Sequence, residues 1–296
     1  MSAHVVMIVS TVTMATIAVV AIIRRRNANA VDLAYLVGRA VDADGIVLGA
    51  EGFMLRGTNA RGLLLLHGSG DSPQSMRYFA DRLNAAGYTV YAPLLPGHGR
   101  SPRAFAAARA EEFLAAARAG LATARAAAPW VGVIGLSMGG ALATRIAAEA
   151  SDVRVLVLLA PYLITPEPVR RAARTAWLWT LFVKYVGGGG ETSVHDVGAR
   201  KASHAYGTFS AGALRALDQT ATAGRQALPS LSVPTLVINS EQDNRIPQAY
   251  AEKIIAEIRA PVESHWVSQC GHVITVDYCK DTVADQVLAF LARHAD

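Results

Sequence analysis

The sequence predicts an α/β domain built around a mostly parallel sheet. Stretches of branched apolar residues alternate with Ala-rich stretches, and some of the apolar runs, such as 63–66 and, apart from Arg154, 153–159, are continuous. Continuous apolar runs are typical of strands that helices cover on both faces, and their alternation with helical stretches indicates parallel pairing. The length of 296 residues suits one such domain with an insertion.

The order of the elements follows from periodicity and from the residues that end each run. Gly87 and Pro129 supply two of the expected helix ends. We expect strands at 46–50, 61–66, 88–92, 130–135, 153–159, 234–239 and 262–267, and helices at 75–86, 110–126, 138–150, 248–259 and 280–294. These elements place the core of the domain in residues 46–160 and 230–296.

The alternation breaks down between residues 161 and 229. This stretch contains Pro166, Pro168, an apolar cluster at 177–182 and four glycines at 187–190. Long segments without strand signals inside a compact domain are usually functional insertions, and consecutive glycines make a flexible joint. We therefore predict that residues 161–229 form a lid or cap over a pocket. The alternative is that the apolar cluster only forms the core of a small helical subdomain.

The N-terminus begins with an apolar segment. Residues 5–23 contain no charged side chain and are followed by Arg24, Arg25 and Arg26. The run matches the roughly 20 residues that cross a bilayer core, and its positive charges come after it, unlike those of a secretory signal peptide. We predict a membrane anchor at 1–26 and a linker at 27–45, with the α/β domain on the cytoplasmic side by the positive-inside rule. The alternative is a cleaved leader and an exported product.

Charge and cysteine content exclude some classes of protein. The formal charge is +5, but apart from the triplet at 24–26 the arginines are scattered through Ala-rich stretches without a nucleic-acid-binding motif. We therefore expect no nucleic-acid partner, and the triplet suits anionic lipid headgroups. Two cysteines, Cys270 and Cys279, make neither a disulfide framework nor a metal-type pair. We expect both to be ordinary thiols.

The strongest motif is Gly135-Leu136-Ser137-Met138-Gly139, which lies between an expected strand and an expected helix. Glycines on both sides of a serine permit the sharp strand-to-helix turn that raises a nucleophilic hydroxyl above the sheet. A serine hydroxyl is a weak nucleophile at neutral pH and needs an adjacent base. The motif predicts Ser137 as a catalytic nucleophile.

Two loops later in the chain supply an acid and a base. Asp243 follows the strand expected at 234–239, and His272 follows the strand expected at 262–267. Loops after neighbouring parallel strands open at the same edge of a sheet, and the order Ser, Asp, His suits this kind of turn. We predict that His272 is the base and Asp243 the acid that orients it, with Glu241 as the rival acid. His67 and His98 are expected to be structural.

Acyl transfer also needs backbone N–H donors where negative charge develops. Met138 N–H, next to the nucleophile, is one candidate, and Ser69 N–H, in the loop His67-Gly68-Ser69-Gly70, is the other. The loop does not match the dinucleotide-binding motif Gly-x-Gly-x-x-Gly, because position 73, where the third glycine would be, is proline.

These motifs resemble the α/β-hydrolase superfamily, and within it the bacterial carboxylesterase and monoacylglycerol lipase (lysophospholipase-like) branch. The resemblance covers roughly residues 60–295 and is carried by HGSGDSP, LLPGHGRS, GLSMGG, Asp243-x-x-Ile246-Pro247 and GHVITVDYCKDTVADQVLAFL. It implies an α/β-hydrolase fold with a helical lid, a pocket for acyl chains, and neither cofactor nor metal. The N-terminal anchor and the lid sequence depart from the family pattern, so the resemblance does not identify the substrate.

We therefore expect a serine carboxylic ester hydrolase that forms an acyl-enzyme with a small ester or lipid-like substrate. Apolar side chains line such pockets, and the candidates in the lid are Trp177, Trp179, Leu181, Phe182 and Tyr185. The superfamily also hosts serine peptidases and C–C bond hydrolases, which remain alternatives. A non-catalytic binding module is a further alternative, although it would need a lost triad position.

Overall fold

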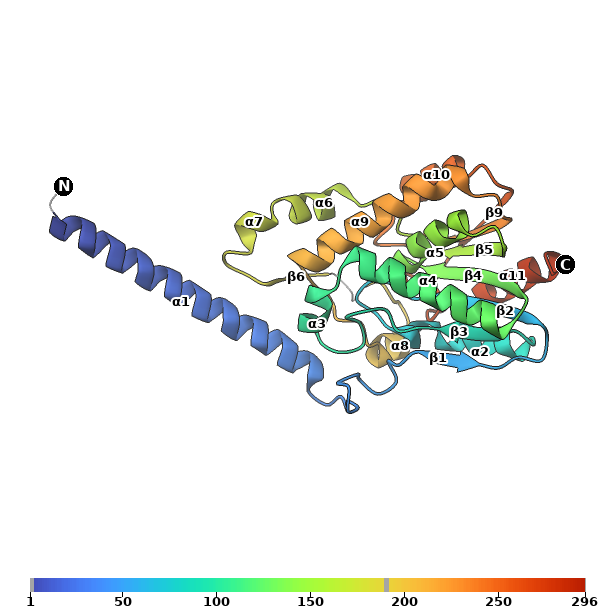
Figure 1. The fold of residues 1–296 in the computed structure, drawn as a ribbon, viewed down its shortest axis with the longest axis horizontal. Coiled ribbons are helices and arrows are strands. Elements are labelled where there is room, and N and C mark those ends of the chain that lie inside the picture. Colours follow the sequence, from blue (N-terminus) through green and yellow to red (C-terminus); the bar gives the residue numbers. More distant parts are fainter. Residues whose placement is uncertain (1–2, 189–191, 296) are drawn as a thin grey trace.

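The computed structural model describes residues 3–188 and 192–295. Its centre is a seven-stranded sheet with the spatial order β1 (Phe53–Leu55), β3 (Thr89–Ala92), β2 (Arg61–Leu66), β4 (Trp130–Leu136), β5 (Val153–Leu159), β8 (Thr235–Ser240) and β9 (Val262–Val267). Figure 1 labels every strand of this sheet except β8. β1 is antiparallel to β3, and every other neighbouring pair is parallel. The predicted α/β architecture with a mostly parallel sheet is confirmed.

Helices cover both faces of the sheet and bury one apolar cluster on each. One face is covered by α2 (Arg77–Ala85), which follows the 3₁₀ turn Pro73–Met76, and by α11 (Lys280–Arg293), with Phe79 and Phe290 fully buried beneath them. The other face is covered by α4 (Ala110–Ala127), α5 (Met138–Glu149), α9 (Ala211–Ala227) and α10 (Gln248–Glu257). This double cover explains why the central strands are continuous apolar runs.

Six of the seven expected strands are present, and the strand expected at 46–50 is wrong. Val47 makes only an isolated bridge with Val41. Gly49, whose φ is +90°, turns the chain there, and the edge strand β1 begins four residues later. The short helix α3 (Pro102–Ala107), capped by the Ser101 side chain, was not expected either.

The N-terminal helix α1 (Ala3–Leu36) extends beyond the expected anchor. Residues 27–36, which we expected in a linker, continue the helix, because neither glycine nor proline occurs between Arg24 and Leu36. This second part packs on the body of the protein, with Ala28 and Tyr35 buried, and Arg103 of α3 pairs with Asp32 at 3.1 Å. The first part projects away from the body (Figure 1).

The expected lid range contains several short elements and one long helix. The short elements are α6 (Glu167–Arg174), α7 (Ala176–Trp179), β6 (Tyr185–Gly187), α8 (Val197–Ala202) and β7 (Thr208–Ser210), with β6 and β7 paired antiparallel. The long helix, α9, packs closely against α5, since a Cβ on Gly224 would lie 2.6 Å from the Ala141 carbonyl oxygen. It thus belongs to the helical layer on the sheet, and we use "cap" below for residues 161–210. Two of the four glycines at 187–190 lie outside the described residues.

The expectation of two free thiols is wrong, because Cys270 and Cys279 form a disulfide. They are nine residues apart, with 5.8 Å between their Cα atoms. The chain leaves β9, makes a compact turn around Asp277 and enters α11 beside its starting point, which brings the two side chains within bonding distance. The disulfide closes the loop that carries His272.

Candidate active site

Ser137 occupies the sharp turn between β4 and α5. Its φ is +55° and its ψ is −117°, a conformation that a non-glycine residue rarely adopts. The flanking glycines permit the turn, because a Cβ on Gly135 would lie 2.2 Å from the Gly139 carbonyl oxygen, and a Cβ on Gly139 would lie 2.0 Å from that of Leu66. The turn therefore requires glycine on both sides of the serine, as the motif predicted.

The predicted nucleophile, base and acid form one chain of hydrogen bonds. Ser137 Oγ lies 2.8 Å from His272 Nε2, and His272 Nδ1 lies 2.7 Å from Asp243 Oδ2. The side chains of His272 and Asp243 are only 8% and 2% exposed, so water does not compete for these contacts. Glu241 is exposed, and Asp243 is the acid that contacts the histidine.

The surroundings of Asp243 keep it ionised. Burial alone would raise its pKa, but the charge and hydrogen bond of His272 and the backbone N–H groups of Ile246 and Arg245 hold the pKa below its ordinary value. Those two N–H groups donate to Oδ1 at 2.9 Å and 2.7 Å. An ionised, immobile carboxylate fixes the imidazole with Nδ1 protonated, which leaves Nε2 free to accept the serine proton.

The two predicted oxyanion donors lie beside the nucleophile. A Cβ on Gly68 would lie 3.4 Å from Ser137 Cβ, so the backbone of the loop 67–70 passes directly against the serine. Ser69 N–H donates no hydrogen bond within the described residues. Met138 is the first residue of α5, where an N–H has no acceptor in its own helix. Both groups are available to an oxyanion on Ser137.

His67 and His98 hold this loop in place, in agreement with the structural role expected for them. His67 Nε2 accepts a hydrogen bond from Leu95 N–H at 3.1 Å, and its Nδ1 donates to the Gly68 carbonyl at 2.9 Å. His98 Nε2 accepts from Gly70 N–H at 3.0 Å. Burial lowers the pKa of His67 well below its ordinary value and that of His98 to about 4, so both rings are neutral.

Asp277 is a positioning residue that the sequence did not reveal. Its buried carboxylate accepts hydrogen bonds from the N–H groups of Gly271, His195 and Asp196, each at 2.8 Å. Burial would raise its pKa, but these backbone donors hold it below the ordinary value. Asp277 thereby ties the His272 loop to the cap. The only available signal was an acidic residue in the turn before the last helix.

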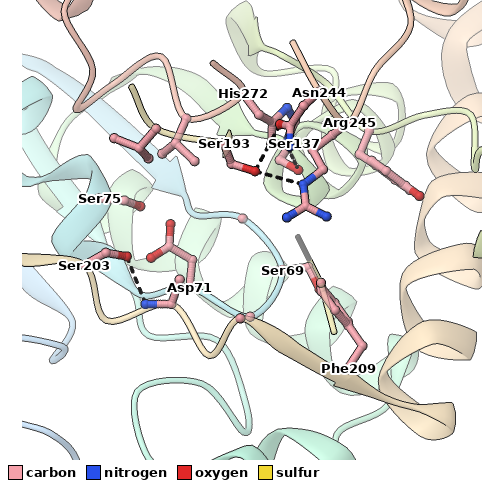
Figure 2. A pocket seen from close by; sticks show the side chains of 18 of the residues that line it. Ser69, Asp71, Ser75, Ser137, Ser193, Ser203, Phe209, Asn244, Arg245 and His272 are labelled. Carbon is pink, nitrogen blue, oxygen red and sulfur yellow. Dashed lines mark hydrogen bonds between the residues drawn. The ribbon is translucent and has the colours of Figure 1, made fainter. Parts of the chain in front are cut away.

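A cavity of about 1860 Å³ opens above the triad, between the sheet edge and the cap. Figure 2 shows Ser137, His272 and Arg245 on one wall and Ser69, Asp71 and Phe209 across from them. The cavity exceeds the roughly 300–1,000 Å³ of common small-molecule sites. Its apolar lining comes mainly from the cap and α9: Val169, Ala172, Trp179, Val186, Phe209, Leu214 and Leu217.

Of the five predicted lid residues, only Trp179 lines this cavity. Its indole Nε1 donates to the Ala172 carbonyl at 2.8 Å. Trp177, Leu181 and Phe182 are 73%, 55% and 61% exposed on the outer surface, and the Tyr185 hydroxyl lies 3.4 Å from Asp32 of α1. These four residues, which we also expected to line the cavity, do not line it. Trp177 and Trp179 are two residues apart on the single turn α7 and therefore point to opposite sides, whereas Leu181, Phe182 and Tyr185 follow α7 in the chain.

Comparison with known proteins gives consistent results. A model described as the alpha/beta hydrolase family matches residues 63–286. A thermostable monoacylglycerol lipase of Bacillus sp. (strain H-257) is 27% identical, and the match spans 84% of this chain and 97% of the relative. A carboxylesterase of Bacillus subtilis (strain 168) is 24% identical, and the match spans 79% of this chain and 93% of the relative. Among solved structures, one from a study of the metagenome-derived lipolytic enzymes LipS and LipT superposes with a TM-score of 0.77 at 28% identity, covering 84% of this chain and 100% of the other.

Proposed function

The chain belongs to the α/β-hydrolase family and is a carboxylic ester hydrolase, and we propose that Ser137, His272 and Asp243 carry out its reaction. The observation that carries this proposal is the unbroken hydrogen-bond chain from Ser137 Oγ through His272 to Asp243 on the wall of a large cavity. The predicted α/β-hydrolase fold is confirmed by the same family match and by the sheet topology.

In the proposed mechanism, Ser137 Oγ attacks the ester carbonyl while His272 Nε2 takes its proton. The N–H groups of Ser69 and Met138 stabilise the oxyanion that forms. His272 then returns the proton to the leaving alcohol as the C–O bond breaks, which gives an acyl-enzyme. A water molecule deacylates Ser137 by the same steps, with His272 again acting as base and then acid.

We propose acyl esters of lipid-like size, such as monoacylglycerols, as the substrates. The relative from strain H-257 is named a monoacylglycerol lipase, and that from strain 168 a carboxylesterase. The apolar lining from the cap and α9 supports an acyl-chain site, since burial of one methylene contributes about 0.8 kcal/mol.

A fluorophosphonate label tests the proposal. We expect an adduct on Ser137 in the wild-type protein, none in Ser137→Ala, and hydrolysis of 1-lauroylglycerol by the wild type. A folded wild-type protein that neither reacts nor hydrolyses esters would indicate a binding module. Faster cleavage of peptide amides than of esters would favour the serine peptidase alternative.

We also propose that α1 anchors the enzyme to a membrane. Within the described residues, the segment 6–36 is the one helical segment long and apolar enough to cross a membrane. Its most apolar part has a mean hydropathy of 2.5, and none of that part is buried. α7 lies at the end of the body toward which α1 projects (Figure 1). The exposed apolar side chains Trp177 and Leu178 belong to α7, and Leu181 and Phe182 follow it in the chain. A bilayer crossed by α1 would therefore face this tip of the cap.

For the orientation of the anchor, we propose that the catalytic domain is cytoplasmic, because the basic triplet at 24–26 follows the apolar segment. The Cys270–Cys279 disulfide favours the opposite side, since disulfides persist mainly in oxidising compartments. These are the chain's two cysteines, so acid trapping of cells followed by alkylation decides between the sides. Free thiols would support a cytoplasmic domain, and a disulfide in freshly trapped protein would contradict it.

A further inference from the structure

Arg245 is a basic residue in the active-site cavity that the proposed mechanism does not use. It lies two residues after Asp243, in the loop between β8 and α10, and lines the cavity together with Ser137 and His272. Figure 2 shows its guanidinium reaching into the cavity from the same wall as His272. The two terminal nitrogens make no hydrogen bond or ion pair within the described part of the chain.

The side chain is held in this position by the cap. Arg245 Nε donates to Ser193 Oγ at 2.9 Å, and Ser193 Oγ lies 3.0 Å from Asn244 Oδ1. One edge of the guanidinium is thus fixed and its other nitrogens are presented to the cavity. A planar guanidinium presented in this way suits bidentate binding of a carboxylate or phosphate.

Arg245 also lacks a carboxylate partner among residues 3–188 and 192–295. It is half-buried, and this burial lowers its pKa more than Tyr162 and Asp243 raise it. Asp243, the acid nearest to it in sequence, already accepts hydrogen bonds from His272 and from two backbone N–H groups. The Arg245 guanidinium is therefore a partly desolvated cation, and no acid among the described residues serves as its own counter-ion.

The charge of the whole lining has the same sign. Among the described residues, seven arginine or lysine side chains and four acidic ones line the cavity. Of those four acids, Asp243 is engaged with His272, and Asp196 caps α8 by accepting from Ala199 N–H at 3.0 Å. A net positive cavity raises the local concentration of anionic ligands.

The position of Arg245 indicates which part of an ester it would meet. His272 must deliver a proton to the leaving alcohol, so the alcohol lies on the His272 side of the scissile bond. Arg245 projects from that same wall, whereas the apolar lining comes mainly from the cap and α9. We propose that Arg245 binds an anionic group, phosphate or carboxylate, on the alcohol part of the ester and makes the enzyme prefer anionic acyl esters to neutral ones.

This inference rests on the proposed ester hydrolysis, and the test separates the two. Three soluble esters with the same acyl chain are compared: 1-hexanoylglycerol, 1-hexanoylglycerol 3-phosphate and 3-hexanoylglycerate. We expect the wild type to show a higher kcat/KM for at least one of the anionic esters than for the neutral one. Arg245→Leu should lower the anionic-to-neutral ratio by about 10- to 100-fold, mainly through KM, because a charge-assisted hydrogen bond is lost. The two anionic esters show whether phosphate or carboxylate fits better.

Two further variants serve as controls. Arg245→Lys keeps the positive charge but not the planar guanidinium, and it should retain part of the anionic-to-neutral ratio of kcat/KM. Lys201→Gln removes an exposed cation of the same cavity and should change that ratio by less than about threefold. If Arg245 only supported the Asp243 loop, Arg245→Leu would lower kcat equally for all three esters, which would overturn the inference.

Binding is measured independently of turnover, by calorimetry with glycerol 3-phosphate. The wild type should bind it, and Arg245→Leu should bind it at least about tenfold more weakly. An equal affinity for both proteins, together with an unchanged ratio, would refute the inference while leaving ester hydrolysis intact. Loss of ester hydrolysis in the wild type would instead refute the proposed function.

Discussion

The two halves of the active-site cavity are built in different ways. The sheet half consists of loops after β2, β4, β8 and β9, in which the His272 and Asp243 side chains are buried and each held by two or more hydrogen bonds. The cap half consists of helices of four to eight residues and two three-residue strands, with much of its apolar surface exposed. The proposed catalytic residues therefore lie in loops of the buried sheet, whereas the proposed acyl-chain contacts lie mainly on elements with little core of their own.

The largest expected effect is in the sheet half. Ser137→Ala and His272→Ala should each lower kcat by at least roughly ten-thousand-fold, because the nucleophile and its base act as a unit. Asp243→Asn should lower kcat by roughly the same factor, because an asparagine would hold His272 in the tautomer that cannot accept the serine proton. Ester hydrolysis and calorimetric melting of each variant check this. Glu241→Gln is the matched control in the same loop, and a severe loss there with normal turnover in Asp243→Asn would contradict the assignment.

A second prediction concerns stability in the sheet half. Burial raises the pKa of Asp71 from 3.8 to about 6, so ionisation of this side chain costs more in the folded than in the unfolded protein. The destabilisation grows as the pH rises from about 4 to about 6 and is constant above that range, reaching about 3 kcal/mol for a shift of two units. Asp71→Asn should therefore stabilise the protein at pH 8 and have little effect near pH 4.

Denaturant unfolding at several pH values measures this difference. Asp81→Asn, a substitution of a half-exposed acid on α2, serves as the control and should show no comparable pH dependence. A stability gain for Asp71→Asn that was the same at pH 4 and pH 8 would mean that the effect does not come from the charge.

The contrast between the halves also explains what the sequence could predict. The strands β2, β4 and β5 are mainly apolar and end in turns, and the proposed triad lies in loops that parallel pairing brings to one edge. Local patterns were sufficient there. Asp277 and Arg245 were missed because their partners come from the cap, more than 50 residues earlier in the chain.

The cap defeated prediction for a related reason. The apolar cluster at 177–182 indicated contact with an apolar substrate. However, α7 is a single helical turn, too short for periodicity to show which side faces the cavity. The edge strand β1 was also too short to give a strand signal. The disulfide depends on the tight turn around Asp277, which spacing alone does not reveal.

The third prediction is in the cap half and concerns chain length. Trp179 lines the cavity, so Trp179→Ala should remove apolar contact with long acyl chains only. We expect kcat/KM for a C12 ester to fall by roughly 10-fold and that for a C2 ester to fall by less than about twofold, since a few buried methylenes account for about one to two kcal/mol. An equal loss for both esters with a lower melting temperature would make Trp179 a structural residue of the cap.

The smallest effect is expected at the outer surface of the cap. Trp177 and Phe182 are exposed and do not line the cavity, so the double substitution Trp177→Ser and Phe182→Ser should leave hydrolysis of soluble hexanoyl esters unchanged. If this tip meets the bilayer that α1 crosses, the same variant should hydrolyse a long-chain ester embedded in vesicles several-fold more slowly, because apolar area no longer enters the lipid. Leu48→Ser, which replaces a 53% exposed apolar side chain between α1 and β1, should alter neither rate. Equal rates for the double variant and the wild type on vesicles would show that α1 alone mediates membrane association. The cap would then contribute to catalysis only through its inner face.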